Sequence, residues 1–335
     1  MRGNSLASGF GVTYTSIMYA TFADPRTDFV FKRIFGVESR KHLLIALINH
    51  LLELQGKHRV VDIQHTPPDQ HVDIPELKMS IVDVKCTDAM GRRFVVEMQI
   101  LKIEGFEKRV VYNASKAYVM QLRSGDDYPV LCDVVGITIC NFNLWTDTNS
   151  SGAYKVPMLS RWRMQEQHSG VTGLSHVQYT FLELPKYNAG DNPTSLIDKW
   201  AYFFREAKNI DVIPPALAEQ PFLEAFDVAR RATFTAAEWE YYDRLKMAEQ
   251  DARGAISIAL KDGIEQGLNL GIKQGIDRGK VQGKRESLLK LLTRAKIEMT
   301  PAQLTRIETC DDVTQLDQWF DRAIGASSAA DVFGE

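Results

Sequence analysis

The sequence has few cysteines, and none has the spacing of metal ligands. The four cysteines, Cys86, Cys132, Cys140 and Cys310, include no CxxC pair, and the seven histidines form no HExxH motif. A zinc site is therefore not expected. A chain of 335 residues is also long enough to fold without disulfides. We expect buried free thiols in a reducing compartment, the cytoplasm.

Long apolar runs and an excess of positive charge are also missing. No stretch approaches the roughly 18 apolar residues of a membrane span, so no membrane partner is expected. The net charge is −3, whereas proteins that bind nucleic acids usually have a basic surface. The charge is uneven, however. Residues 261–298 hold nine Lys and Arg against five Asp and Glu, and residues 299–335 hold two against seven.

Apolar periodicity predicts a mixed α/β layer in residues 24–190. Asp24 and Pro25 are typical of a helix start, and a second helix is expected over about 39–54. Strands are expected over 59–64, 77–87 and 92–101, then a helix over 105–123 and a strand within 129–142. That last run is continuously apolar, as in a strand buried on both faces. Two more strands are expected at 160–166 and 177–184.

The remaining sequence predicts helices. One is expected between Thr194 and about residue 207, and the capping box of Thr235 and Glu238 opens another. Glycine recurs at every fourth position from 263 to 283. The expected parts are a disordered extension at 1–23, which lacks the apolar core of a signal peptide, an α/β domain at 24–190, a helical extension at 191–255, a glycine-ladder helix at 256–297, and a helical hairpin with a frayed tail at 298–335.

One predicted hairpin, SIVDVKCTDAMGRRFVVEMQI, carries a cluster of polar side chains. A three-residue loop would place Gly91 in the left-handed conformation that favours glycine and would centre the hairpin on residue 90. Asp83 and Glu97 then face each other with Cβ atoms about 5 Å apart. Because side chains alternate along a strand, Gln99 shares their face. The opposite, core-facing side is expected to hold Val82, Val84, Val96, Met98 and Ile100.

Two facing carboxylates repel each other, and a divalent cation would remove that penalty. Oxygen ligands suit Mg²⁺, Mn²⁺ or Ca²⁺, and such an ion would polarise a phosphodiester and activate water. The alternative is a solvated sheet face on which Lys85 and Arg93 form ion pairs with Asp83 and Glu97.

Five segments follow one another along the chain in a specific order: TDFVFKRIFG, SRKHLLIALINHLLEL, the hairpin, KRVVYNASKAYVMQLRSGDDYPVL and GITICNFNLW. Together they resemble the PD-(D/E)xK superfamily and, within it, the Rpn family of recombination-promoting nucleases and transposases. The glycine ladder and short helical end also look like the C-terminal region of this family. The resemblance implies a restriction-endonuclease-like α-β-β-β-α-β core at 24–190 followed by a helical C-terminal region.

The resemblance also implies residue roles. Asp83 stands at the metal-binding Asp of the family, Glu97 at the acidic position of its ExK-type motif, and Gln99 where many members of the superfamily have Lys. A neutral Gln can orient water, but it supplies less charge to the transition state than Lys would, so weak catalysis is an open possibility. The carbonyl of Met98 would be a further metal ligand, and Asp28 would contribute an acid from the first helix.

The helix after the hairpin is a candidate DNA-binding surface. Arg109, Tyr112 and Gln121 match the family pattern. Arg109, Tyr112 and Lys116 can share one helix face. With Lys102 and Lys108 they are expected to contact phosphates. A solvated helix face is the alternative.

The glycine ladder needs a compensating interaction, because each glycine costs about 1 kcal/mol in a helix interior. One candidate is close packing against a helix of another copy, of the small-xxx-small kind. Glycines four residues apart are displaced by about 40° around the helix axis, so the row of glycines winds around the helix. This favours a short or wrapped contact with the second helix. The alternatives are a flexible linker and DNA contact through Lys280, Lys284 and Arg285.

The sequence therefore predicts a Mg²⁺-dependent DNA endonuclease (an endodeoxyribonuclease) linked to recombination or mobile elements. One alternative is a catalytically weak or inactive DNA-binding or regulatory protein on the same fold, motivated by Gln99 and the acidic balance. Another is a homo-oligomeric interaction protein held together by the glycine-ladder helix.

Overall fold

The computed structural model describes residues 21–67, 69–70 and 80–334. The chain divides into two compact units, one ending at Lys246 and the other beginning at Met247. Helix α6 (Ala236–Arg294) begins in the first unit and continues into the second. In the described part of the chain, no helix is long and apolar enough to cross a membrane.

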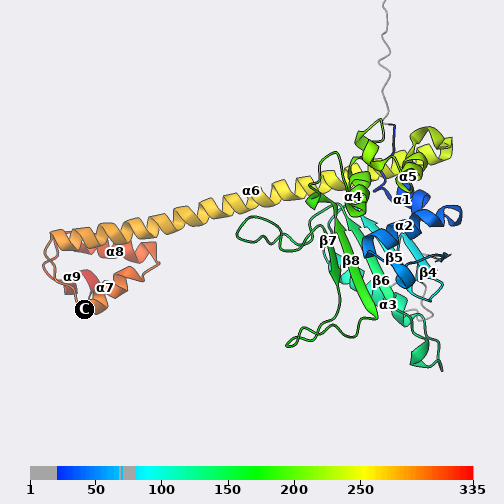
Figure 1. Cartoon of the computed structure of the whole chain (residues 1–335). Coiled ribbons are helices and arrows are strands. Elements are labelled where there is room, and N and C mark those ends of the chain that lie inside the picture. The colour runs from blue at the N-terminus through cyan, green and yellow to red at the C-terminus, as the bar shows by residue number, and fades with distance from the viewer. Residues whose placement is uncertain (1–20, 68, 71–79, 335) are drawn as a thin grey trace, which may run out of the picture. The chain divides into compact units, whose positions relative to one another are not determined.

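The first unit is built on a six-stranded sheet with strand order β1-β4-β5-β6-β8-β7 (Figure 1). Strands β5, β6 and β8 are parallel neighbours at its centre, and the outer pairs are antiparallel. The predicted mixed layer is therefore confirmed. The strands are β1 Ile63–Thr66, β4 Val84–Asp88, β5 Arg93–Gln99, β6 Val134–Cys140, β7 Leu159–Trp162 and β8 Val177–Glu183; β2 Asp69–Gln70 and β3 Ser80–Ile81 form a separate pair.

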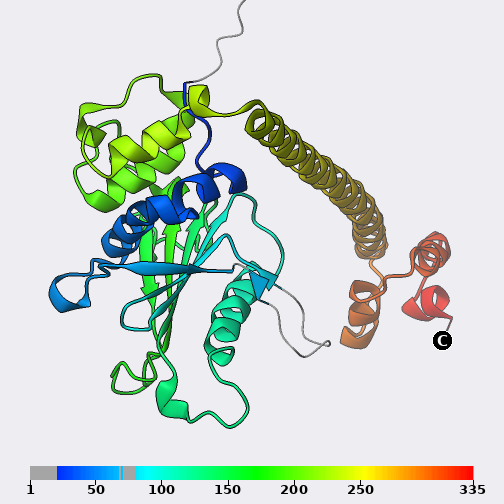
Figure 2. The same ribbon diagram turned by 90° about the vertical axis from the view of Figure 1, so that its right-hand side faces the viewer.

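Helices cover both faces of the sheet (Figure 2). One face packs against α1 (Asp28–Phe35), α2 (Lys41–Leu52), α4 (Leu196–Glu206) and α5 (Phe222–Ala229) in the larger core. The other face packs against α3 (Phe106–Val119). Short 3₁₀ turns connect these elements at Glu38–Arg40, Gly56–His58, Tyr128–Val130, Leu184–Lys186, Ala207–Asn209, Pro215–Leu217 and Arg231–Thr233.

The start of the first unit differs from expectation. Phe22 and Ala23, placed by sequence in a disordered extension, are fully buried, and the Ala23 amide donates to the Ala229 carbonyl at 2.8 Å. Residues 1–20 of that expected extension lie outside the described residues. The helix start predicted at Asp24 is wrong: α1 begins at Asp28 after Thr27. The Asp24 carboxylate accepts hydrogen bonds from Arg26 instead of capping a helix.

Several other boundaries shifted. The first strand lies later than predicted, at β1, and residues 71–79 of the predicted second strand and its approach lie outside the described residues. Ser195, rather than Thr194, caps α4. The capping box of Thr235 and Glu238 is confirmed by their reciprocal hydrogen bonds.

The second unit has its own small core. Helices α7 (Pro301–Glu308), α8 (Val313–Ala323) and α9 (Ala329–Phe333) pack with the end of α6 around Leu288, Leu316 and Trp319. The frayed tail predicted for the last ten residues is wrong, because Val332 and Phe333 are buried in this core.

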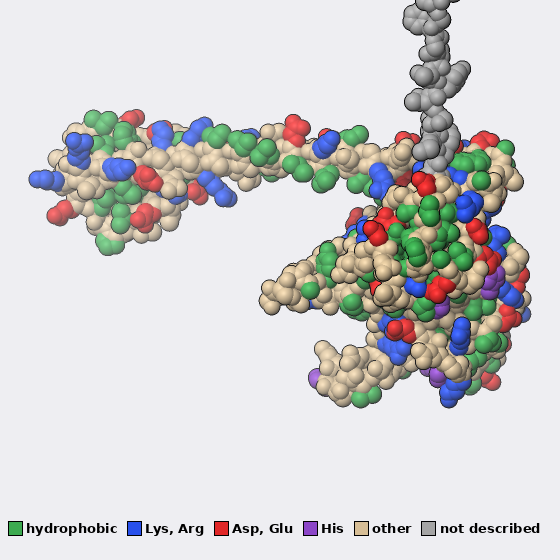
Figure 3. Space-filling model, turned by 45° about the horizontal axis from the view of Figure 1, so that its top comes forward, with side chains coloured by type: hydrophobic (Ala, Val, Ile, Leu, Met, Phe, Trp, Pro, Cys, Tyr) green, Lys and Arg blue, Asp and Glu red, His purple; other side chains and the backbone are tan. Residues whose placement is uncertain are grey.

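The glycine ladder lies within continuous helix. A Cβ built on any glycine from 263 to 283 would meet nothing within 4 Å in the described structure. Apolar side chains follow the first four glycines of the ladder and are exposed, and Figure 3 shows hydrophobic side chains along the surface of this helix. They are Ile264, Leu268, Ile272 and Ile276. The described chain therefore offers no packing partner for this stripe.

Candidate active site

The predicted hairpin register is confirmed. Strands β4 and β5 pair from Val84 opposite Val96 to Thr87 opposite Arg93, which centres the hairpin on residue 90. Gly91 has a φ of 82°, in the left-handed region that favours glycine. The polar residues of interest lie at the open end of this hairpin, where β5 runs parallel to β6.

Asp83 lies in a bend immediately before β4. Its carboxylate accepts a hydrogen bond from the backbone amide of Met98 at 2.6 Å, which ties the bend to β5. The bend also breaks the expected alternation, since Val84 faces the larger core whereas Val82 packs with Val95 beneath α3. The prediction that both valines face the same core is wrong for this reason.

Burial dominates the electrostatics of Asp83. Loss of solvent, together with the negative charges of Asp28 and Glu97, raises its pKa to about 7 against the lowering effect of the Met98 amide and Lys32. Asp28 and Lys32 form an ion pair of 2.7 Å on α1. Helix α1 therefore brings a third acid, Asp28, within electrostatic range of Asp83.

Glu97 is buried, with 6% of its surface exposed. Asn113 of α3 donates a hydrogen bond to its Oε1 at 2.5 Å, and Arg109 Nη2 lies 3.8 Å from its Oε2. Burial raises the pKa of Glu97, while Asn113 and Arg109 oppose the rise. Its Oε2 is buried and has no hydrogen-bond partner among the residues described.

Gln99 is engaged at both ends of its amide. Its Nε2 donates to the Leu101 carbonyl at 2.8 Å, and its Oε1 accepts from Arg109 Nη2 at 2.5 Å. Arg109 therefore bridges Gln99 and Glu97.

The donor set fits a hard divalent cation that keeps part of its water shell. Within the described ranges, no group of three His, Cys, Asp or Glu side chains lies close enough to hold a metal alone. Mg²⁺, however, is commonly bound through one or two carboxylates with water completing its shell. The unpaired Oε2 of Glu97 beside Asp83 is the kind of buried acceptor that a cation would satisfy.

The ion pairs of the alternative interpretation are not formed in the described structure. Lys85 and Arg93 contact neither Asp83 nor Glu97 as ion pairs there. Lys85 is buried at 8% exposure, and burial, together with the charges of Arg93 and Lys116, lowers its pKa. The sheet face beneath α3 is therefore not a solvated, charge-paired surface.

The expected DNA-contacting residues divide into two groups. Lys102 and Lys108 are exposed, as a phosphate contact requires. Lys116 is only 7% exposed and lies over the Tyr112 ring, and burial lowers its pKa. Arg109 turns into the acidic site.

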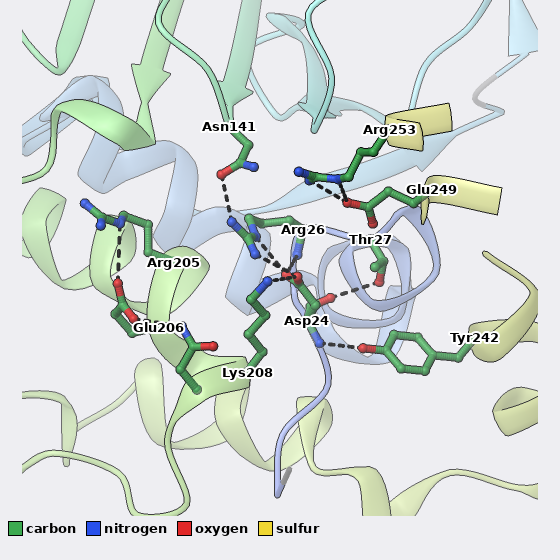
Figure 4. Close-up of polar contacts among 11 residues, drawn as sticks. Asp24, Arg26, Thr27, Asn141, Arg205, Glu206, Lys208, Tyr242, Glu249 and Arg253 are labelled. Carbon is green, nitrogen blue, oxygen red and sulfur yellow. Dashed lines mark hydrogen bonds and ion pairs between the residues drawn. The ribbon is translucent and has the colours of Figure 1, made fainter. Parts of the chain in front are cut away.

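Sequence reasoning missed a supporting network at the end of β6, shown in Figure 4. Arg26 donates to the side chains of both Asp24 and Asn141, and the backbone amide of Asn141 donates to the backbone carbonyl of Gln99 at 2.9 Å. Lys208 and the Tyr242 hydroxyl also contact Asp24. The only sequence signal was the polar run around Asp24, which was interpreted as a helix start.

Comparison with known families gives one match. Residues 25–259, more than half of the chain, match the model of a PD-(D/E)XK nuclease family transposase. Comparisons with curated proteins and with solved structures found no match. The matched range includes the sheet and the acidic site formed by Asp83 and Glu97, and the resemblance noted in the sequence is thus confirmed. The chain belongs to the PD-(D/E)XK nuclease family of transposases.

Proposed function

We propose that this protein is a metal-dependent nuclease that hydrolyses phosphodiester bonds within DNA during recombination or the movement of mobile elements. The observation that carries the proposal is the buried pair of acids at the end of β5. Asp83 and Glu97 both have raised pKa values, and Glu97 Oε2 lacks a partner in the described structure. The cysteines are unpaired, which favours action in the cytoplasm.

In this proposal the ion is Mg²⁺, with Mn²⁺ or Ca²⁺ as alternatives, and its ligands are the carboxylates of Asp83 and Glu97 and the carbonyl of Met98. A bound ion would polarise the phosphoryl oxygen and lower the pKa of water. The Met98 amide fixes the Asp83 carboxylate, and Asn113 fixes that of Glu97. Asp28 adds negative charge that favours cation binding.

DNA would lie across the start of α3. Lys102 and Lys108 are exposed there and would bind backbone phosphates, with Arg109 and Tyr112 closer to the acids. Lys116 would attract the phosphates only through the electrostatic field of its ammonium group, without direct contact, because its side chain is buried.

Plasmid nicking in Mg²⁺ tests the proposal. Asp83→Ala and Glu97→Ala should each lower the rate at least 100-fold, because each removes a metal ligand. Asp127→Ala, which removes an exposed acid, is the matched control and should cleave like the wild type. Equal rates in all four proteins would overturn the assignment.

A catalytically quiet DNA-binding protein is the second candidate. It is favoured by Gln99, which is neutral and has both ends of its amide engaged within the protein. Calorimetry separates the two candidates: DNA binding without divalent-metal binding would support the quiet protein, whereas metal binding lost in Asp83→Ala would support the nuclease.

We also propose that a second copy of the chain packs antiparallel on the apolar stripe of α6. Lys261 and Asp277 lie eight residues to either side of Asn269, and Glu265 and Lys273 lie four residues to either side. An antiparallel copy centred there places opposite charges beside each other, whereas a parallel copy in register places like charges together.

Light scattering of the full chain tests this arrangement. The wild type should have twice the 37.9 kDa mass of one chain, and Leu268→Asn with Ile272→Asn should reduce it to one. Lys261→Asp should weaken association, and adding Asp277→Lys should restore it. A single-chain mass for the wild type would contradict the proposal.

A further inference from the structure

The acidic site contains hydrogen-bond acceptors and a hydrogen-bond donor that have no partner in the described structure. Glu97 Oε2 and Asn113 Oδ1 are buried acceptors, and Arg109 Nε is a buried donor; none has a hydrogen-bond partner within the described part of the chain. Leaving such groups unsatisfied costs free energy. A cation would satisfy the acceptors, whereas the guanidinium group of Arg109, on a side chain that is 40% exposed, offers positive charge and N–H donors to an anionic oxygen. The complementary ligand is therefore a phosphate accompanied by a metal ion.

We propose that Arg109 is a catalytic residue that binds a non-bridging oxygen of the scissile phosphate and stabilises the negative charge that develops there. Gln99 is then a positioning residue that holds the guanidinium in place. This inference rests on the proposed nuclease function and names the positively charged side chain that acts at that site.

The contacts of Gln99 support this division of roles. Its Nε2 donates to the Leu101 carbonyl at 2.8 Å, and this bond orients the amide so that Oε1 faces Arg109. The Oε1 atom accepts from Arg109 Nη2 at 2.5 Å. A glutamine held at both ends is poorly suited to orienting water, but it is well suited to fixing a guanidinium group.

Arg109 is also positioned to remain both charged and reachable. It lies in the first turn of α3, and its guanidinium carbon is 5.4 Å from the centre of the buried Phe106 ring. The side chain is 40% exposed. Glu97 neutralises it only partly, at 3.8 Å. A guanidinium presents several donors in a fixed plane, a geometry that matches a phosphate.

Single-turnover and steady-state cleavage of a DNA duplex in Mg²⁺ tests the inference. Arg109→Met should lower kcat about 100-fold or more, as loss of one charge-stabilising donor does, and should change KM little. Gln99→Ala should lower kcat less. Lys57→Met, which removes an exposed cation that has no assigned part in DNA binding, is the matched control and should leave both kcat and KM unchanged.

A charge-rescue variant separates catalysis from structure. Gln99→Lys in the Arg109→Met background places an ammonium next to the vacated guanidinium position and should recover at least tenfold of the lost rate. A merely structural arginine would not be rescued in this way. Calorimetry supplies a readout besides activity: Arg109→Met should still bind Mg²⁺, whereas Asp83→Ala should not.

The outcomes distinguish this inference from the proposed function. If the wild type and Asp83→Ala are equally inactive, the nuclease assignment itself fails. If Asp83→Ala is inactive but Arg109→Met cleaves as fast as the wild type, only the role of Arg109 is overturned. Loss of activity in Arg109→Met without rescue by Gln99→Lys would also overturn it, provided that circular dichroism shows both variants folded.

Discussion

Replacing Asp83 with asparagine should stabilise the metal-free protein in a manner that depends on pH. The substitution keeps a side-chain oxygen that can accept from the Met98 amide, but it removes a group that ionises in a buried place. The wild-type carboxyl has a pKa of about 7 in the folded chain against an ordinary value of 3.8. Between these two pH values the folded state binds more protons than the unfolded state.

The sign and size of the effect follow from this difference. The free energy of unfolding of the wild type falls as the pH rises from about 4 to about 7, because the unfolded state releases its proton first. A difference of about three pH units corresponds to about 4 kcal/mol. Asp83→Asn should therefore stabilise by an amount that grows by about 2–3 kcal/mol between pH 5 and pH 8.

Urea unfolding with a chelator at pH 5 and pH 8 measures this effect. Tryptophan fluorescence reports mainly on the first unit, because four of the five tryptophans lie before Lys246. In Mg²⁺ the order should reverse, since the cation stabilises only the ionised carboxylate. Equal stability of the two proteins at pH 8 without metal would refute the reasoning that burial, rather than a partner, governs Asp83.

Three further predictions concern other parts of the molecule. Lys85→Met should raise the free energy of unfolding on the order of 1 kcal/mol at pH 7. Because burial lowers the pKa of Lys85, this gain in stability should shrink as the pH approaches 10. Urea unfolding at both pH values measures the gain, and an equal gain at pH 7 and pH 10 would contradict the prediction. Trp200→Ala should cost about 3–5 kcal/mol because its side chain is fully buried, whereas Val212→Ala, on a surface residue, should change little. Gly267→Ala and Gly271→Ala should each raise the free energy of unfolding of α6 by about 1 kcal/mol, since an added Cβ meets nothing within 4 Å in the described structure. A double variant with less helix than the wild type by circular dichroism would contradict this prediction.

Local signals in the sequence were sufficient for the hairpin and the buried strand. Gly91 and a three-residue loop determine the register of β4 and β5, and the observed pairing from Val84 opposite Val96 to Thr87 opposite Arg93 follows that register. The continuous apolar run of β6 likewise predicted a strand buried on both faces. The capping box of Thr235 and Glu238 likewise formed as its spacing predicts.

The contacts that complete the site were not predictable in this way. Arg26 and Asn141 are 115 residues apart, and their hydrogen bond depends on how α1 docks against the end of β6. Arg109 was predicted as a DNA contact from its helix face, but its bond to Gln99 depends on the angle at which α3 crosses the sheet. The apolar periodicity of a sequence predicts which side of a helix is buried, but it does not predict which element packs against that side.

The attachment of α1 has a consequence for how the protein is synthesised. The amide of Asp24 donates to the Tyr242 hydroxyl at 2.9 Å, and Arg33 forms an ion pair with Glu238 and a hydrogen bond to the Thr233 carbonyl. A ribosome adding 5–20 residues per second needs about 10–40 s to reach these partners after α1 has been made. During that interval α1 can pack against α2 and the sheet, but these polar contacts cannot form. A message truncated before the codon for Thr233 would therefore encode the sheet and its acids without these polar contacts made by Asp24 and Arg33 at the two ends of α1.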